Sequence, residues 1–222
     1  MADRAQGRQP EENEDSVACD AALGLVAISD GASTAARPEV WSRLLTESYT
    51  AGADPLTPEV LAELRQRWHA AVRDDALPWY AVAKLAEGSA ATFLGLRVDG
   101  DRYAATGVGD SCLFHLSGER LVSVGPLEDW TQFSRFPALI STSGDLDAAA
   151  IWRTEGEAAD GDVFVLATDA VAQHLLRSHA CDDVVPAVHE HLDSAADFAA
   201  YVERERGRGL ANDDSTVCVV LT

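Results

Sequence analysis

The order of secondary-structure patterns along the chain predicts an α+β fold, a four-layer α-β-β-α sandwich with two mainly antiparallel sheets. Strand-like runs come first, two helical patterns follow, and four further strand-like runs precede more helices and a terminal strand. Two sheets packed face to face, with helices outside, would bury the apolar runs on both sides. The chain has 222 residues, of which 47% are hydrophobic, enough for one sizeable core. We expect a single domain over 15–222, after a loose polar segment at 1–14.

The first half of the chain is expected to hold two strands and three helices. The runs at 15–20 and 24–29 are strand-like, and helical patterns cover 37–52 and 58–75. A shorter helix is expected around 79–86. Within the second helix, apolar residues recur at helical spacing, namely Val60, Leu61, Leu64, Trp68 and Ala71.

The second half is expected to alternate strands with loops and helices. From Ser89 the pattern changes to four short strand-like runs, whose turn signals are Asp99–Gly100, Gly109–Asp110 and Ser117–Gly118. Periodicity fades over 126–150, which is expected to be mainly loop. Strands return over 151–169, and a β-branched strand closes the chain at 215–222. Helical patterns lie at 170–178, 182–192 and 194–207.

The charge balance argues against two classes of partner. The chain has 37 acidic and 17 basic residues and a formal net charge of -20. Such a surface repels nucleic acid and anionic membranes, so we expect neither as a partner. Solubility in a proteome rich in acidic residues is a simpler explanation for most of the excess. Any anionic substrate would still need a local positive charge to offset the repulsion.

The sequence indicates a cytoplasmic location. Residues 1–15 lack the apolar core of a secretory signal, and no run is long enough to span a membrane. The cysteines contain no CxxC pair and indicate neither a disulfide framework nor a zinc site; they are Cys19, Cys112, Cys181 and Cys218.

Three aspartates stand at the ends of expected strands. Asp30 follows the run at 24–29, Asp169 follows DVFVLAT, and Asp213 precedes the terminal strand. If the terminal strand is antiparallel to the others, the three carboxylates meet at one edge. Close carboxylates repel each other unless a cation neutralises them, and Mg²⁺ or Mn²⁺ suits oxygen ligands better than zinc does. Gly31 has no Cβ, so its carbonyl could approach such an ion.

A simpler explanation exists for each aspartate taken alone. Aspartate is a common N-cap, and each of these residues stands near an expected helix or turn. The joint occurrence of three aspartates at strand ends favours the metal site over three independent caps.

Five motifs, in order, resemble the type 2C metal-dependent protein phosphatases, the PPM family. NEDS looks like the family's N-terminal acidic motif, and AISDGAS resembles its strand-end Asp-Gly. GSAATFLGLRVDGDRYAATGVGDSCLFHLSGERL is similar to its Gly-Ser/Thr-Ala strand, hairpin and Gly-Asp-Ser motif. GDVFVLATDAVAQHLL resembles its strand-Asp-helix motif, and NDDSTVCVV resembles its final strand. The resemblance covers most of the chain and is of the bacterial type.

The resemblance implies a site for two divalent ions, Mn²⁺ or Mg²⁺, with a third ion bound more weakly. Asp30 would bridge the two ions, and the carbonyl of Gly31 would bind the second. Asp169 and Asp213 would hold the first ion, so Asp30, Asp169 and Asp213 are the implied catalytic residues.

Further acidic residues have implied roles around these ligands. Glu14 and Asp15 would orient metal-bound waters from behind the ligands, and Asp110 would help to hold the third ion. For Asp110 a turn residue is an equally good interpretation. Asp214 would be a structural hydrogen-bonding residue rather than a ligand.

The implied activity is hydrolysis of phosphoserine and phosphothreonine in proteins, opposing a protein kinase. Two ions would lower the pKa of a bridging water, and the resulting hydroxide would attack phosphorus in line with the leaving oxygen. The ions would also offset the charge of the phosphoryl oxygens.

The chain departs from the family pattern at four positions. Pro10 stands where members usually carry an Arg that grips the phosphate, and Arg8 or Arg4 could replace it, with Arg8 as the preferred candidate. Ala32 stands in place of a His found in many eukaryotic relatives, which would leave proton delivery to water. Ala170 and Cys112 replace a usual Gly and Arg.

Two alternatives stay open. The missing Arg is compatible with a catalytically weak binding or regulatory module on a phosphatase fold. The same ions could also serve a small-molecule phosphatase. The histidines at 174, 179, 189 and 191 are interpreted as surface residues, and the five tryptophans as core and helix-packing anchors.

Overall fold

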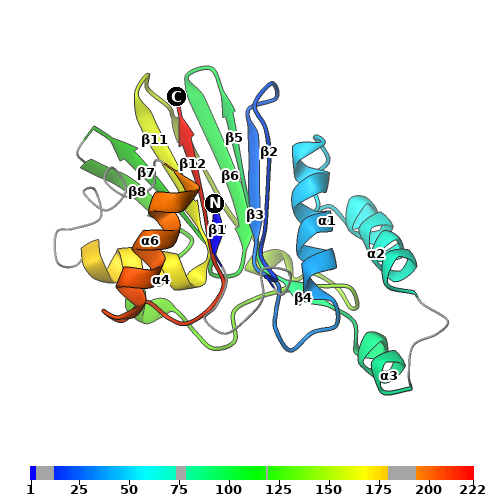
Figure 1. The fold of residues 1–222 in the computed structure, drawn as a ribbon. Coiled ribbons are helices and arrows are strands. Elements are labelled where there is room, and N and C mark those ends of the chain that lie inside the picture. The colour runs from blue at the N-terminus through cyan, green and yellow to red at the C-terminus, as the bar shows by residue number, and fades with distance from the viewer. Residues whose placement is uncertain (4–12, 74–78, 119, 180–193) are drawn as a thin grey trace.

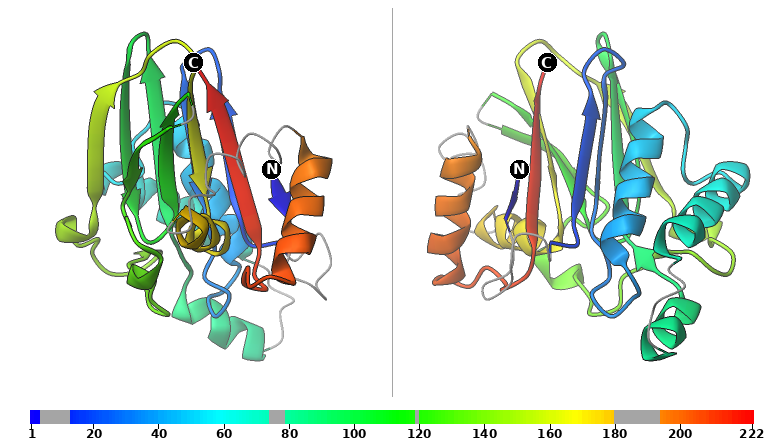
Figure 2. Two further views of the ribbon diagram at one scale, coloured as in Figure 1. Left: turned by 90° about the vertical axis from the view of Figure 1, so that its left-hand side faces the viewer. Right: turned by 45° about the vertical axis from the view of Figure 1, so that its right-hand side comes forward.

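The computed structural model describes residues 1–3, 13–73, 79–118, 120–179 and 194–222. Its described strands form two five-stranded sheets that pack against each other (Figures 1 and 2). One sheet has the order β1 (Ala2–Asp3), β12 (Ser215–Leu221), β11 (Asp162–Ala167), β7 (Cys112–Ser117) and β8 (Arg120–Gly125). The other has the order β10 (Trp152–Glu157), β6 (Arg102–Val108), β5 (Phe93–Asp99), β3 (Leu25–Ser29) and β2 (Ser16–Asp20). Every pairing in both sheets is antiparallel.

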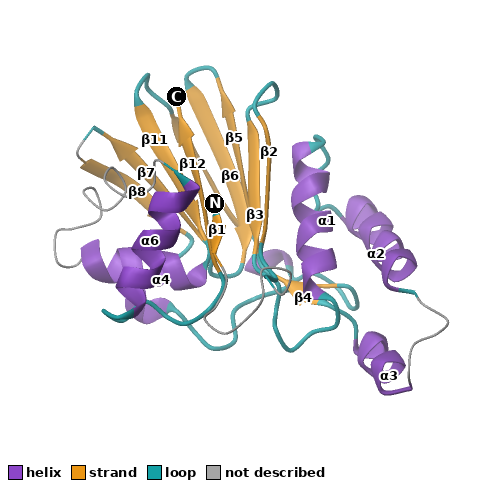
Figure 3. Cartoon of the chain, in the orientation of Figure 1, coloured by secondary structure: helices purple, strands orange, loops and turns teal. Residues whose placement is uncertain are grey.

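Helices cover the outer face of each sheet (Figure 3). On the β3 side lie α1 (Pro38–Thr50), α2 (Pro58–Val72) and the more distant α3 (Trp79–Glu87). On the β12 side lie α4 (Asp169–His179) and α6 (Ala195–Arg206). The predicted α-β-β-α sandwich is confirmed. No helix among the described residues is long and apolar enough to cross a membrane.

Three apolar clusters account for the layers. Phe164, Leu94 and Ile28 are buried between the two sheets, whereas Trp41 and Trp68 are buried under α1 and α2. A third cluster lies between α4, α6 and the β11 sheet. Each fully buried large side chain contributes roughly 1.5–3 kcal/mol to stability. Strands β3 and β11 are buried along their whole length because each has a sheet on one face and a helix on the other.

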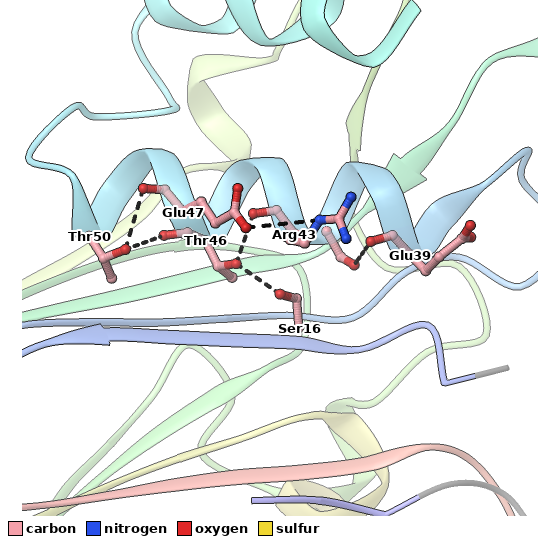
Figure 4. A network of polar contacts seen from close by, with 7 residues as sticks. Ser16, Glu39, Arg43, Thr46, Glu47 and Thr50 are labelled. Atoms are coloured by element: carbon pink, nitrogen blue, oxygen red, sulfur yellow. Dashed lines mark hydrogen bonds and ion pairs between the residues drawn. The ribbon is translucent and has the colours of Figure 1, made fainter. Parts of the chain in front are cut away.

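Helix α1 is tied to strand β2 by a polar contact within this packing. Ser16 Oγ lies 2.9 Å from Thr46 Oγ1, and Thr46 Oγ1 also donates to the carbonyl of Arg43 (Figure 4). Thr50 Oγ1 bonds to the carbonyl of Thr46 one turn later. The contact with Thr46 holds Ser16, the first residue of β2, which directly follows Glu14 and Asp15.

The strands and helices expected from the sequence are present with small shifts at their ends. The irregular stretch contains two short 3₁₀ turns, η2 (Trp130–Gln132) and η3 (Ala148–Ala150). It also contains β9 (Ile140–Ser141), which pairs with β4 (Ala90–Ala91). The expected helix at 182–192 lies outside the described residues, as do residues 4–12 of the expected loose segment. Residues 2–3 pair with β12, which the sequence did not indicate.

One interpretation of a side chain was wrong. His174 is not a surface residue, because its side chain is only 10% exposed and lies 3.4 Å from Glu205 Oε2. Trp130 is 38% exposed and packs against α4, where the guanidinium of Arg177 lies over its ring. The side chains of His179, His189 and His191 lie outside the described part of the chain.

Candidate functional site

The antiparallel sheets bring the strand-end aspartates to one cavity. Because β11 and β12 are antiparallel, the end of β11 and the start of β12 lie at the same end of the sandwich. The end of β3, in the other sheet, lies at that end too (Figure 1). A cavity of ≈ 520 Å³ opens there. Its lining includes four carboxylates, those of Asp30, Asp110, Asp169 and Asp213.

Thr92 holds Asp30 in position. The backbone N–H of Asp30 donates to Thr92 Oγ1 (3.0 Å), and the N–H of Thr92 donates to the carbonyl of Asp30 (2.8 Å). Thr92 Oγ1 also lies 3.1 Å from Ser111 Oγ, so one hydroxyl links Asp30 to the turn after β6. Thr92 lies in the Gly-Ser/Thr-Ala motif, which by itself does not predict these bonds.

Gly31 is required by packing in this structure. A Cβ at Gly31 would lie 2.7 Å from the carbonyl oxygen of Glu14 and 2.8 Å from Pro38 Cβ, both too close for a real contact. Gly31 also forms an isolated bridge with Ala91. The expected role of the Gly31 carbonyl as a metal ligand stays a prediction. The need for a residue without a Cβ at this position is explained by the contacts with Glu14 and Pro38.

Glu14 and Asp15 lie behind the cavity carboxylates. The N–H of Glu14 donates to Asp214 Oδ2 (2.9 Å), and Ser33 Oγ donates to Glu14 Oε2 (2.5 Å). Thr168 Oγ1 donates to Asp15 Oδ2 (3.1 Å), whereas Asp15 Oδ1 is buried without a hydrogen-bond partner. Asp214 therefore accepts a hydrogen bond, as the sequence predicted. Thr168, like Thr92, is a hydrogen-bonding position that the sequence did not predict.

Asp110 and Asp213 differ in their surroundings. Asp110 is 5% exposed, and its Oδ1 is buried without a partner. Asp213 is exposed, and its Oδ1 accepts the N–H of Asp214 (2.9 Å). Arg206 Nη2 donates to the carbonyl of Asp213 (2.9 Å), which fixes the backbone before β12. Both carboxylates line the same cavity.

Burial, followed by repulsion from neighbouring carboxylates, raises the pKa of four acids in and behind the cavity, namely Asp15, Asp30, Asp110 and Asp169. It raises the pKa of Asp110 to about 7, with the charge of Asp169 as the next cause. It raises the pKa of Asp15 to about 7 and that of Asp169 to about 6. The pKa of Asp30 lies well above its usual range because of burial and then of four neighbouring charges, those of Asp15, Asp169, Asp213 and Asp110.

The chemistry of these donors fits a hard divalent cation. Two buried carboxylate oxygens, Asp15 Oδ1 and Asp110 Oδ1, have no partner, and Asp30 is surrounded by like charges. Oxygen donors of this kind favour Mg²⁺ or Mn²⁺ over softer metals. Among the described residues, no three His, Cys, Asp or Glu side chains form a closed metal cluster. Asp30, Asp110, Asp169 and Asp213 line the cavity together.

The structure places the departures from the family pattern in different parts of the molecule. Ala32 lines the cavity, whereas Cys112 is buried in the cluster beneath α4. Pro10 and Arg8 lie outside the described residues. Two lining residues that the sequence analysis missed, Arg135 and Phe136, come from the segment without periodicity. No pattern in that segment could have identified them.

A family model described as protein phosphatase 2C matches residues 5–205. The chain belongs to the protein phosphatase 2C family. The resemblance seen in the five motifs is thereby confirmed, and the matched range includes Asp30, Asp110 and Asp169. No curated protein matches the chain in sequence.

Solved protein phosphatase 2C structures have the same fold. The catalytic domain of the serine/threonine protein phosphatase PstP, in complex with 2 manganese ions, is 20% identical, with a TM-score of 0.62 and coverage of 99% of this chain and 94% of that chain. PppA, a regulatory component of T6SS in Pseudomonas aeruginosa, is 19% identical, with a TM-score of 0.64. The match covers 100% of this chain and 96% of PppA. Stp1 from Staphylococcus aureus is 14% identical, with a TM-score of 0.66 and coverage of 100% and 93%. At these identities the likeness shows the fold.

Proposed function

We propose that this chain is a phosphatase of phosphoserine and phosphothreonine proteins that depends on Mn²⁺ or Mg²⁺. The observation that carries the proposal is the position of Asp30, whose carboxyl is repelled by three other carboxylates that line the same cavity and by Asp15 behind them. In a protein phosphatase 2C fold, such an arrangement is best explained by a site for cations. The manganese bound by the similar PstP domain supports the choice of ion.

The strand-end acids would hold the ions. Asp30, Asp169 and Asp213 are the proposed ligands, together with the carbonyl of Gly31, and Asp110 is proposed for a third ion. Bound divalent ions supply a water of lowered pKa as the nucleophile and positive charge for the phosphoryl oxygens.

The other residues of the chain would orient the reacting groups. Glu14 and Asp15 lie behind the ligands, where their carboxylates can accept hydrogen bonds from water. Thr92 holds the backbone of Asp30 in place. Ala32 carries no titratable group, so the proton for the leaving oxygen would come from water. A cytoplasmic location and an opposing protein kinase are part of the same proposal.

The test is the release of phosphate from a phosphoserine peptide with Mn²⁺, with Mg²⁺, and with EDTA. We expect turnover only with a divalent ion and its loss in Asp30→Asn. Asp99→Asn is the matched control, because Asp99 is an exposed aspartate that pairs with Arg97 far from the cavity lining. Turnover that survives in EDTA, or an Asp30→Asn variant as active as the control, would refute the proposal.

The two alternatives give different results in the same assay. A binding or regulatory module would take up Mn²⁺ in a calorimetric titration without hydrolysing the peptide. A small-molecule phosphatase would hydrolyse phosphorylated metabolites faster than peptides.

A further inference from the structure

The acidic cavity has one cation at its rim. Among the described residues that line it, Arg135 is the only basic one, opposite four carboxylates. Arg135 is exposed and forms no hydrogen bond or ion pair with a described residue. Its guanidinium is therefore available to a ligand, although acids that could have paired with it line the same cavity.

The neighbour of Arg135 is unusually exposed. Phe136 is 89% exposed, the highest value among the large apolar side chains of the described chain. A single exposed apolar residue is common on protein surfaces. This one, however, lines the candidate site next to Arg135, the only basic residue among the described lining residues.

The segment that carries this pair is fixed on its N-terminal side. Asp129 and Gln132 form a capping box around η2. Gln173 Nε2 of α4 donates to the carbonyl of Trp130 (3.3 Å), and the guanidinium of Arg177 lies 5.5 Å from the Trp130 ring centroid. The segment is thereby attached to the helix that begins at Asp169.

The segment is fixed on its C-terminal side as well. Trp41 Nε1 of α1 donates to the carbonyl of Ile140 (2.8 Å), and β9 pairs with β4. Arg65 Nη2 of α2 donates to the carbonyls of Ser141 (3.1 Å) and Gly144 (2.5 Å). With both ends attached to different helices, the residues between them are held beside the cavity while the side chains of Arg135 and Phe136 stay uncovered.

We propose that Arg135 binds the phosphoryl group of the substrate and that Phe136 packs on an apolar side chain next to the phosphorylated residue. This inference rests on the proposed function and deepens it by naming a phosphopeptide with an apolar flanking residue as the substrate. A guanidinium can donate two parallel hydrogen bonds to phosphoryl oxygens. Arg135 thus supplies the phosphate contact that Pro10 cannot make.

Charge complementarity supports the assignment. The chain carries a formal net charge of -20, so a phosphate dianion is repelled by most of its surface. A fixed cation at the cavity rim offsets that repulsion where the phosphate must enter. Phe136 lies next to Arg135 in the cavity lining. A small phosphate ester bound at Arg135 has no side chain that could also contact Phe136, whereas a phosphopeptide has one.

The experiment compares Arg135→Ala, Arg135→Lys and Phe136→Ala with two controls on exposed residues outside the cavity, Arg153→Ala and Leu221→Ala. Substrates are a phosphoserine peptide with flanking Leu, the same peptide with flanking Gly, and free phosphoserine, each with Mn²⁺. All the substituted side chains are exposed, so folding is expected to be retained, and circular dichroism checks it.

Arg135→Ala is expected to raise KM roughly 10- to 100-fold for all three substrates, as loss of a hydrogen bond to a charged group does. Arg135→Lys should restore part of the loss. Phe136→Ala should raise KM about 3- to 10-fold for the Leu peptide and leave the Gly peptide and free phosphoserine unchanged. Values for Arg135→Ala equal to those of Arg153→Ala would overturn the role of Arg135, and an unchanged preference for Leu in Phe136→Ala would overturn that of Phe136.

A second measurement separates this inference from the proposed function. Anisotropy of a labelled phosphopeptide and of its unphosphorylated form reports binding in EDTA, without turnover. If the wild type hydrolyses no substrate but binds only the phosphorylated form, and Arg135→Ala does not, the proposed function fails and the inference stands. If neither hydrolysis nor phosphate-dependent binding is seen in the wild type, both fail.

Discussion

Strand β11 begins at Asp162 and is followed two residues after its end by Asp169, and the two carboxylates have different neighbours. At its start, Asp162 is 4% exposed, and its Oδ2 lies 2.8 Å from His115 Nε2 and accepts the N–H of Ala159 (2.9 Å). Burial alone would raise its pKa, but hydrogen bonds from Ser117 and His115 outweigh burial and lower it. Just beyond the other end, Asp169 faces Asp213, and burial with this repulsion raises its pKa to about 6.

The difference separates a carboxylate that has its own hydrogen-bond donors from one that is held among like charges. A buried carboxylate that has its own donors needs nothing further, so Asp162 stabilises the fold as it stands. Asp169 is held beside like charges with one internal donor, the N–H of Ala170 (2.5 Å). A chain that retains such a residue tolerates repulsion at a site where a bound cation would relieve it.

The largest expected effect comes from the end of β11 that faces the cavity. Asp169→Asn should lower kcat/KM at least about 1000-fold, because it removes a charged ligand of the proposed ions, a loss of several kcal/mol. The same change should raise the free energy of unfolding of the metal-free protein by about 0.5–2 kcal/mol, since it relieves repulsion and Asn can still accept the N–H of Ala170. Phosphopeptide turnover and urea unfolding measure the two quantities. A metal-free variant less stable than the wild type would contradict this account.

The identical substitution at the other end should have the opposite sign. Asp162→Asn leaves His115 with a weaker partner in a buried position, so the free energy of unfolding should fall by about 1–3 kcal/mol. Turnover should stay within about twofold, because Asp162 does not line the cavity. The same two assays apply. A gain in stability, or a large loss of activity in a folded variant, would remove the distinction between the two ends.

The pH dependence of stability should differ between the two kinds of carboxylate. Asp15 and Asp169 have pKa values of about 7 and about 6 in the folded protein, above those of an unfolded chain. Their favourable contribution is thus complete below about pH 4 and is lost as pH rises through 6 to 7. In EDTA, the free energy of unfolding should decrease from pH 5 to pH 8. The decrease is up to about 1.4 kcal/mol per pH unit for each proton that the protein releases when it unfolds.

Asp162 should act on the opposite side of the pH range. Its pKa is lowered, so its stabilisation is present above the unfolded value and is lost as pH falls through the folded value. Urea unfolding at several pH values, with EDTA or Mn²⁺, tests both slopes. Mn²⁺ should remove the decrease toward pH 8 by neutralising the cavity acids. Maximal stability of the metal-free protein at pH 8 would show that the cavity acids are not repelling one another.

The strand-end acids could be predicted because they depend only on local pattern and strand direction. An apolar run fixes where a strand ends, and antiparallel pairing then brings Asp169 and Asp213 to the same end. Thr92 and Thr168 could not be predicted in this way. Their bonds reach Asp30 and Asp15 across 62 and 153 residues, and a threonine next to the end of a strand has no sequence signal for such a partner.

Other misses have the same physical origin. His174 looked like a surface residue because its partner, Glu205, lies on a different helix. Arg135 lies in a segment whose position is set by contacts with α1, α2 and α4 rather than by any period of its own. Gly31 was assigned to metal approach, whereas its lack of a Cβ is already required by Glu14 and Pro38. Contacts between elements decide these roles.

The smallest expected effect concerns a second buried carboxylate that, like Asp162, has partners. Glu205 is 7% exposed, and its Oε1 lies 2.9 Å from Arg204 Nε and 3.1 Å from Arg208 Nη1. Burial alone would raise its pKa, but Arg204 and Arg208 outweigh burial and lower it, as they would for a structural residue. Glu205→Gln should therefore reduce the free energy of unfolding by only about 1 kcal/mol, because both arginines are solvent-exposed and Gln keeps an uncharged acceptor for them and for His174. Turnover should be unchanged. Thermal unfolding at pH 7 measures the loss, and an increase in stability would place Glu205 with the repelled acids of the cavity instead of with Asp162.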